Sequence, residues 1–184
     1  YDSSKDFTTS EDIQIGKNVY IGKNVKIGKG VIIGPGCFVG NNVEIGEESY
    51  LYPNVTIYSS TTLGKKNIIH ANSVLGSDGL GFSKNNDSWE KIEHLGNLLL
   101  ADDVEIGAAC TIDRGSLGKT VLNSGVKLDN QVHIAHNCDI GKNTIIGAKT
   151  AIAGSTKVGE GCLIGGGCGI VDNIEIERNV RINP

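Results

Sequence analysis

Residues 13–46 decide the fold, and they read IQIGKNVYIGKNVKIGKGVIIGPGCFVGNNVEIG. In this stretch an aliphatic residue recurs at every sixth position from Ile15, and a glycine follows it each time. The aliphatic ladder continues to Leu75, resumes at Leu100, and resumes again from Leu122 to Ile182. A period of six gives no single apolar stripe on an α-helix, so the pattern excludes a helical fold and indicates a repetitive β structure.

Strand alternation explains the apolar positions of each hexad. The residue two positions before the ladder residue is small or β-branched, as at Val25, Cys37 and Thr144. Residues two apart in a strand share a face, so both positions are expected to point inward and the residue between them outward. Three hexads would close a triangular coil in which residues 18 apart in the sequence stack at the ~4.8 Å spacing of strands. The pattern therefore predicts an all-β parallel β-helix of about eight coils.

The corners between strands carry a second signal. Glycine follows most ladder residues, and Asn recurs two positions after it, as at Asn18, Asn24 and Asn143. Glycine at a fixed place implies unusual backbone angles or an approach too close for a side chain. Asn tolerates the left-handed conformation, so each corner is expected to contain one such residue.

Two interruptions divide the ladder, and we expect residues 13–184 to form the β-helix after a lead-in at residues 1–12. Residues 77–97 do not follow the hexad and contain Trp89, the single tryptophan, together with His94. Four extra residues lie around residues 115–120. Insertions in a solenoid become loops on its faces and often carry function. We therefore expect the longer loop to be functional, with His94 able to touch a ligand.

Composition restricts the class of protein. The chain has 184 residues, which predicts one domain, and its net charge of −4 argues against nucleic acid as the main partner. No apolar run approaches the ~20 residues of a transmembrane segment, and no signal peptide is visible, so we expect a cytoplasmic protein with reduced thiols. The five cysteines share the inward fifth hexad position and are predicted to be core residues, not disulfides or metal ligands. They are Cys37, Cys110, Cys138, Cys162 and Cys168.

A polar cluster at residues 129–137 departs from the simple repeat and contains two histidines. His133 falls on an outward strand position and His136 on a corner, so the two are expected to point in different directions. A corner histidine can be merely solvated, but imidazole titrates near neutrality and can act as a general base. The different directions disfavour a shared zinc site, and we predict no metal.

Five motifs occur in one order: GSDGLGF at 76–82, WEKI at 89–92, TIDRG at 111–115, VHIAHN at 132–137 and IAGST at 152–156. Together they resemble the UDP-3-O-acylglucosamine N-acyltransferases of lipid A synthesis. The resemblance implies a left-handed helix, an exception to the usual right-handed parallel crossover. It also implies a homotrimer with active sites between neighbouring prisms and no cofactor. The family's N-terminal uridine-binding domain and C-terminal helices have no counterpart in this sequence, which we interpret as a fragment of a larger protein.

The same resemblance implies a reaction and its catalytic residues. A 3-hydroxyacyl chain would pass from acyl carrier protein to the 2-amino group of UDP-3-O-acylglucosamine. His136 matches the family's catalytic base, and Gly154 matches the glycine whose N–H faces the developing oxyanion. Gly154 follows His136 by 18 residues, so the repeat alone places it one coil further along, at the ~4.8 Å strand spacing.

Four further residues are implied to contact or orient the substrate. Asp129 occupies the matching acidic position and could support the histidine, while Asn130 and Asn137 flank the site. Asn173 stands where the family has a second histidine.

Two alternatives stay open. The related UDP-N-acetylglucosamine O-acyltransferases share a His-Ile-Ala-His element but lack the TIDRG segment. A non-catalytic prism that serves as an assembly scaffold is the other.

Overall fold

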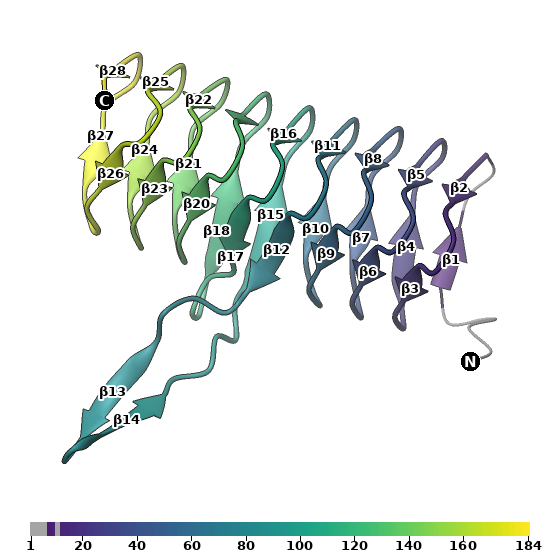
Figure 1. Cartoon of the computed structure of the whole chain (residues 1–184), viewed down its shortest axis with the longest axis horizontal. Helices are drawn as coiled ribbons and strands as arrows, with labels where there is room; N and C mark the ends of the chain where they lie inside the picture. The colour runs from purple at the N-terminus through teal and green to yellow at the C-terminus, as the bar shows by residue number, and fades with distance from the viewer. Residues whose placement is uncertain (1–6, 10–11) are drawn as a thin grey trace.

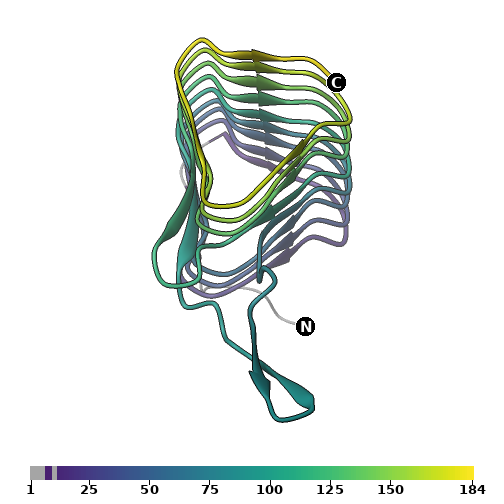
Figure 2. The same ribbon diagram turned by 90° about the vertical axis from the view of Figure 1, so that its left-hand side faces the viewer.

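The computed structural model describes residues 7–9 and 12–184 and consists of three parallel sheets wound into one β-helix (Figure 1). Seen along its axis, the helix is a triangular prism with one sheet on each side (Figure 2). The sheets contain nine, nine and eight strands, which gives about nine turns, one more than the sequence predicted. The all-β parallel β-helix is confirmed.

The strands are short because each side of the triangle is short. The first sheet contains β1 (Phe7–Thr9), β4 (Val25–Ile27), β7 (Glu44–Ile45), β10 (Thr62–Leu63), β15 (Asn97–Leu100), β18 (Lys119–Leu122), β21 (Asp139–Ile140), β24 (Lys157–Val158) and β27 (Glu175–Ile176). The second contains β2 (Gln14–Ile15), β5 (Ile32–Ile33), β8 (Tyr50–Leu51), β11 (Ile68–Ile69), β16 (Glu105–Ile106), β19 (Lys127–Leu128), β22 (Ile145–Ile146), β25 (Leu163–Ile164) and β28 (Arg181–Ile182). The third contains β3 (Tyr20–Ile21), β6 (Phe38–Val39), β9 (Thr56–Ile57), β12 (Val74–Ser77), β17 (Thr111–Asp113), β20 (His133–Ile134), β23 (Ala151–Ile152) and β26 (Gly169–Ile170).

The hand of the helix is left, as the family resemblance implied. Figure 2 looks along the axis with the C-terminal coil nearest the viewer, and the chain turns clockwise as it approaches. A clockwise path that advances toward the viewer is left-handed. β1 joins the first sheet by pairing with β4, so a strand precedes residue 13; residues 1–6 and 10–11 of the expected lead-in lie outside the described residues.

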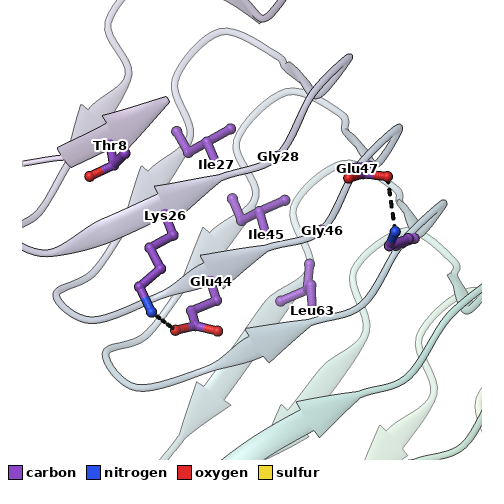
Figure 3. Close-up of a pocket in the computed structure, with 10 residues that line it drawn as sticks. Thr8, Lys26, Ile27, Gly28, Glu44, Ile45, Gly46, Glu47 and Leu63 are labelled. Carbon is purple, nitrogen blue, oxygen red and sulfur yellow. Dashed lines mark hydrogen bonds and ion pairs between the residues drawn. The ribbon is translucent and has the colours of Figure 1, made fainter. Parts of the chain in front are cut away.

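The predicted inward and outward positions are observed. Ile27 pairs with Ile45, 18 residues later, and both side chains are buried while the neighbouring Lys26 and Glu44 point outward and form an ion pair between coils (Figure 3). An exposed ion pair of this kind contributes little to stability. Burial of each aliphatic side chain contributes about 1.5–3 kcal/mol, so the ladder supplies the main stabilisation of the fold.

The corners explain the glycine and asparagine pattern. A Cβ atom on Gly28 would lie 2.6 Å from the backbone nitrogen of Glu47 in the next coil, so close approach excludes any side chain there. The predicted left-handed residue is also present, since Asn18, Asn24 and Asn143 have φ angles of 57°, 56° and 55°. Glycine therefore serves the packing of coils, and asparagine serves the turn.

Side chains at the fifth hexad position also satisfy corner carbonyls. The Thr144 hydroxyl donates to the carbonyl of Gly159 at 2.9 Å, and the Cys138 thiol donates to the carbonyl of Ala153 at 3.1 Å. In both cases the acceptor lies 15 residues later, at a corner of the next coil. Four of the cysteines are buried, Cys168 is partly buried, and all five are free thiols, as predicted. Cysteine and threonine are thus equivalent small donors in this core.

Burial raises the pKa of the Cys138 thiol to about 11. Because the thiolate is the reactive form, only about one molecule in ten thousand carries it at pH 7. We expect native protein to resist iodoacetamide at Cys138 for hours and to react fully in denaturant, as measured by peptide mass spectrometry. Rapid native labelling at pH 7 would contradict the buried placement.

The two interruptions leave the register of the coils intact. Leu63 pairs with Leu100 instead of residue 81, and Ile106 pairs with Leu128 instead of residue 124, so both insertions loop out of the prism. The longer one forms an antiparallel hairpin of β13 (Phe82–Asn85) and β14 (Ser88–Lys91), which projects from the prism (Figure 1).

One side chain fastens the base of the hairpin to the prism. Arg114 donates from Nε to the carbonyl of Gly76 at 2.8 Å and from Nη2 to the carbonyl of Ser59 at 2.6 Å.

The described part of the chain contains no helix long and apolar enough to cross a membrane.

Candidate active site

A pocket of about 360 Å³ lies where the base of the hairpin loop meets the third sheet. Leu80 from the loop forms one wall, and the outward residues and corners of β17, β20, β23 and β26 form the rest. The lining residues are Leu80, Asp113, His133, Ala135, His136, Ala151, Ile152, Ala153, Gly154, Gly169 and Ile170. Two predicted residues, His136 and Gly154, therefore lie in one pocket.

The ring of His136 packs directly on the corner of the next coil. A Cβ atom on Gly154 would lie 2.8 Å from Cε1 and 2.9 Å from Nε2 of His136, so only glycine leaves room for the ring. The backbone holds the two corners together, because the N–H of Ser155 donates to the carbonyl of His136 at 2.9 Å. The spacing of 18 residues thus brings the imidazole and the Gly154 backbone into contact, as expected from the repeat.

The backbone N–H of Gly154 belongs to a group of corner N–H groups that lack a side-chain cap, as at Lys142 and Ala148. At other corners, Lys23, Lys65 and Ala108, the corresponding N–H donates to a side-chain oxygen of the next coil, at 2.8, 2.7 and 2.8 Å. Among residues 7–9 and 12–184, no acceptor lies within hydrogen-bonding distance of the Gly154 N–H. Asp172 occupies the capping position above it, but its carboxylate accepts from the Asn173 side chain at 2.7 Å. The pocket therefore contains a corner donor that is available to a ligand.

Asp113 supplies a buried carboxylate to the same pocket. It accepts a hydrogen bond from Ser77 Oγ at 3.0 Å, and its Oδ2 lies 3.7 Å from His133 Nε2. Burial raises the pKa of Asp113, and the imidazoles of His133, His136 and His94 oppose that shift. The expectation that His133 and His136 point in different directions is wrong, because both rings line this pocket beside Asp113.

The loop covers the site through two glycines. A Cβ on Gly79 would lie 2.8 Å from Cδ2 of His136, and one on Gly81 would lie 2.6 Å from Cε1 of His94. His94 is buried, with 5% of its surface exposed. Its ring meets that of His136 edge-on at a centroid distance of 5.4 Å. The two ring nitrogens of His94 have no hydrogen-bond partner among the described residues. Because Gly79 and Gly81 have no side chains, the imidazoles of His136 and His94 can contact the backbone of the loop.

Three of the four other predicted residues do not lie around His136. Asp129 and Asn130 line a separate groove beside the second sheet, where Asp129 accepts from the N–H of Asn130 at 2.7 Å. Asn173 is exposed. Asn137 does lie beside His136, with its Oδ1 3.1 Å from Nδ1 of the ring. Within the described residues, no three His, Cys, Asp or Glu side chains gather in a metal-binding arrangement.

Three side chains of the pocket, Leu80, Asp113 and His133, were absent from the predicted site. Asp113 and His133 belong to the TIDRG and VHIAHN motifs, so motif membership was a usable signal, although the burial of Asp113 was not visible. Leu80 belongs to the non-hexad loop, where no period fixes the direction of a side chain. Its place in the pocket depends on how the loop folds back onto the prism.

Two family profiles match the repeat. The profile described as bacterial transferase hexapeptide (six repeats) matches residues 12–47 and 119–154, and the hexapeptide repeat of succinyl-transferase matches residues 155–183. The matched residues therefore consist of hexapeptide repeats, in agreement with the period of six in the sequence.

Its similarity to particular proteins is narrower. Over 75 residues, 41% of this chain, it is 55% identical to the UDP-3-O-acylglucosamine N-acyltransferase of Hahella chejuensis. Over 71 residues, 39% of this chain, it is 52% identical to the protein of the same name from Porphyromonas gingivalis. The matched segments span only 22% and 20% of those proteins, about a fifth of their length.

Two solved structures superpose on nearly the whole of this chain. The UDP-N-acetylglucosamine acyltransferase of Francisella novicida superposes with a TM-score of 0.72 at 22% identity, over 95% of this chain and 58% of that one. The Arabidopsis UDP-N-acetylglucosamine acyltransferase gives a TM-score of 0.71 at 25% identity, over 94% of this chain and 62% of that one. These likenesses support the left-handed β-helix.

Substitution of Gly154 tests the contact on which the site depends. Gly154→Ala would place a Cβ 2.8 Å from His136 Cε1, so we expect the ring to move and the free energy of unfolding to fall by about 1–3 kcal/mol. Histidine NMR resonances and urea titration measure the two effects. Gly118→Ala is the control, since a Cβ there meets only Asn137 Nδ2 at 3.7 Å. Unchanged His136 resonances in Gly154→Ala would contradict the packing.

Proposed function

We propose that this chain is the β-helix of an acyltransferase that moves a 3-hydroxyacyl group from acyl carrier protein to the 2-amino group of UDP-3-O-acylglucosamine. The packing of His136 on the Gly154 corner carries the proposal, because it brings a base close to a backbone N–H that has no acceptor among the described residues and can donate to an oxyanion. The names of the relatives that match about two fifths of the chain supply the acceptor.

The chemistry follows from these two groups. The neutral imidazole of His136 takes a proton as the substrate amine attacks the thioester carbonyl. Negative charge then develops on the carbonyl oxygen, and the Gly154 N–H donates to it. Collapse of the tetrahedral intermediate forms the amide and releases the carrier thiol, which takes up a proton. None of these steps uses a metal or an organic cofactor.

Asp113 stabilises the charged state of the base. When His136 takes up a proton it becomes a cation, and the buried carboxylate of Asp113 in the same pocket favours that cation. Within one prism Asp113 therefore fills the supporting role that the family resemblance gave to Asp129.

Asp129 and Asn130 enter the proposal through a second subunit. Asp129 and Asn130 lie beside the second sheet, whose outer face exposes Ile68, Ile145 and Leu163. An apolar outer face of this kind favours contact with another copy. In a homotrimer the second sheet of one prism would face the third sheet of its neighbour, which would bring the pair toward His136. Asn137 Nδ2 and Asn173 remain as substrate contacts.

The acceptor could instead be UDP-N-acetylglucosamine. The structures that superpose on this chain are named for that sugar, and His133 completes the His-Ile-Ala-His element noted above. Assays of the whole protein with each sugar nucleotide and acylated carrier protein separate N-acyl from O-acyl transfer. A non-catalytic scaffold would transfer to neither.

Loss of the base is the direct test. His136→Ala in the whole protein should lower kcat by about 10²–10⁴-fold, the usual contribution of a general base. Turnover is measured by the release of free carrier thiol. Ser88→Ala, in the hairpin turn, serves as the control and should keep the parent rate. Equal turnover of His136→Ala and the parent would sink the proposed mechanism.

Neutralisation of Asp113 tests the electrostatic support. Asp113→Asn keeps the shape but not the charge, and we expect kcat to fall about 10- to 100-fold, or about 1.4–2.8 kcal/mol in barrier height. Because burial raises the pKa of Asp113, the parent enzyme should lose rate as the pH falls through that raised pKa. The part of the acid limb that comes from Asp113 should be missing from the pH profile of Asp113→Asn, where only the fall caused by protonation of the base itself remains. Identical acid limbs in the two enzymes would assign no part of the limb to Asp113.

A further inference from the structure

One side-chain oxygen determines which nitrogen of His136 carries the proton. Asn137 Oδ1 lies 3.1 Å from His136 Nδ1. The same oxygen accepts from the backbone N–H of Ser116 at 3.0 Å and from the Ser116 hydroxyl at 2.8 Å. A backbone N–H can only donate, so the atom that faces it must be the amide oxygen of Asn137 and not the amide nitrogen.

The orientation of Asn137 then fixes the tautomer of His136. Because Asn137 Oδ1 is an acceptor, His136 Nδ1 must be the donor. A neutral imidazole carries one proton, so Nε2 holds the lone pair. A Cβ on Gly154 would lie 2.8 Å from Cε1, 2.9 Å from Nε2 and 3.3 Å from Nδ1, so the face of the ring near Nε2 packs on the Gly154 corner. A base at Nε2 and a donor at Gly154 would reach the same part of a bound substrate.

The short insertion holds Asn137 in this orientation. Ser116 lies within the four extra residues, and its carbonyl accepts from the N–H of Leu95, at the end of the hairpin loop, at 2.7 Å. The backbone of Asn137 is held as well, since its N–H donates to Thr120 Oγ1 at 2.8 Å. Ser116 therefore connects the hairpin loop, the short insertion and the histidine corner through consecutive hydrogen bonds.

We propose that Asn137 is a positioning residue that holds His136 as the Nδ1–H tautomer, and that Ser116 in the short insertion fixes the orientation of Asn137. The inference rests on the proposed function, since a base at His136 gives the tautomer its consequence. It also assigns a purpose to the second interruption of the repeat.

Imidazole nitrogen NMR of protein labelled with ¹⁵N-histidine tests the tautomer without substrate. His136 is assigned by the signal lost in His136→Gln. Asn137 has a φ of 61°, so Asn137→Gly removes the amide without backbone strain. Asn143→Gly is a matched control, because Asn143 has a φ of 55° at the same hexad position of another corner. Asn137→Asp retains an acceptor for the same donors and should restore the parent behaviour.

We expect the parent and Asn143→Gly to show His136 protonated at Nδ1 alone, and Asn137→Gly to show both tautomers. In the transfer assay Asn137→Gly should lose at least about tenfold in kcat because the base is misplaced, whereas a rise in KM from loss of the Nδ2 contact should be shared by Asn137→Asp. Asn137→Asp should recover the single tautomer and most of kcat.

A parent His136 protonated at Nε2, or a single Nδ1–H tautomer in Asn137→Gly, would overturn the inference. The NMR result is independent of turnover. A confirmed tautomer in a protein that transfers no acyl group would remove the proposed function and leave the assignment of Asn137 standing.

Discussion

The close stacking of successive coils is the constraint on which this structure depends. Each corner approaches the next so closely that a Cβ on Gly28 would lie 2.6 Å from a backbone nitrogen. Gly154 lies one hexad position further along, where other coils carry side chains, as at Lys23 and Lys65. A side chain is excluded at Gly154 because the ring of His136 fills the space. The stacking of coils therefore aligns the two corners, and the packing of the His136 ring creates the contact between a base and a backbone donor.

Periodicity determined how much could be predicted. The inward ladder, the left-handed asparagines, the buried cysteines and the stacking of Gly154 on His136 all follow from a fixed spacing in the sequence, and each was found in the structure. The directions of His133 and Asp113 were missed, because an outward strand residue in a parallel sheet can still face a pocket once a loop covers it. Periodicity describes one coil, whereas a pocket depends on what lies over the coil.

The two interruptions of the repeat supply residues that periodicity could not place. The hairpin loop contributes Leu80 to the pocket and packs His94 against the ring of His136, and the short insertion contributes Ser116, which bonds to both the loop and Asn137. Neither contribution has a period, so neither could be placed from spacing. Both insertions nevertheless leave the register of the coils unchanged, because parallel pairing resumes at Leu100 and at Leu122. Function could thus be added to this scaffold without altering its core.

His94 shows the energetic consequence of that addition. Its two ring nitrogens are buried without a partner among the described residues, and an unsatisfied buried polar group costs about 1–3 kcal/mol. The prism itself contains few such groups, since thiols and hydroxyls at the fifth hexad position donate to corner carbonyls. The unsatisfied imidazole lies where the loop rests on the site, so the seated loop is less strongly held than the coils beneath it. Under the proposed function, a loop held in this way would part from His136 more readily than a coil of the prism, and so could admit an acyl donor and a sugar nucleotide to the site.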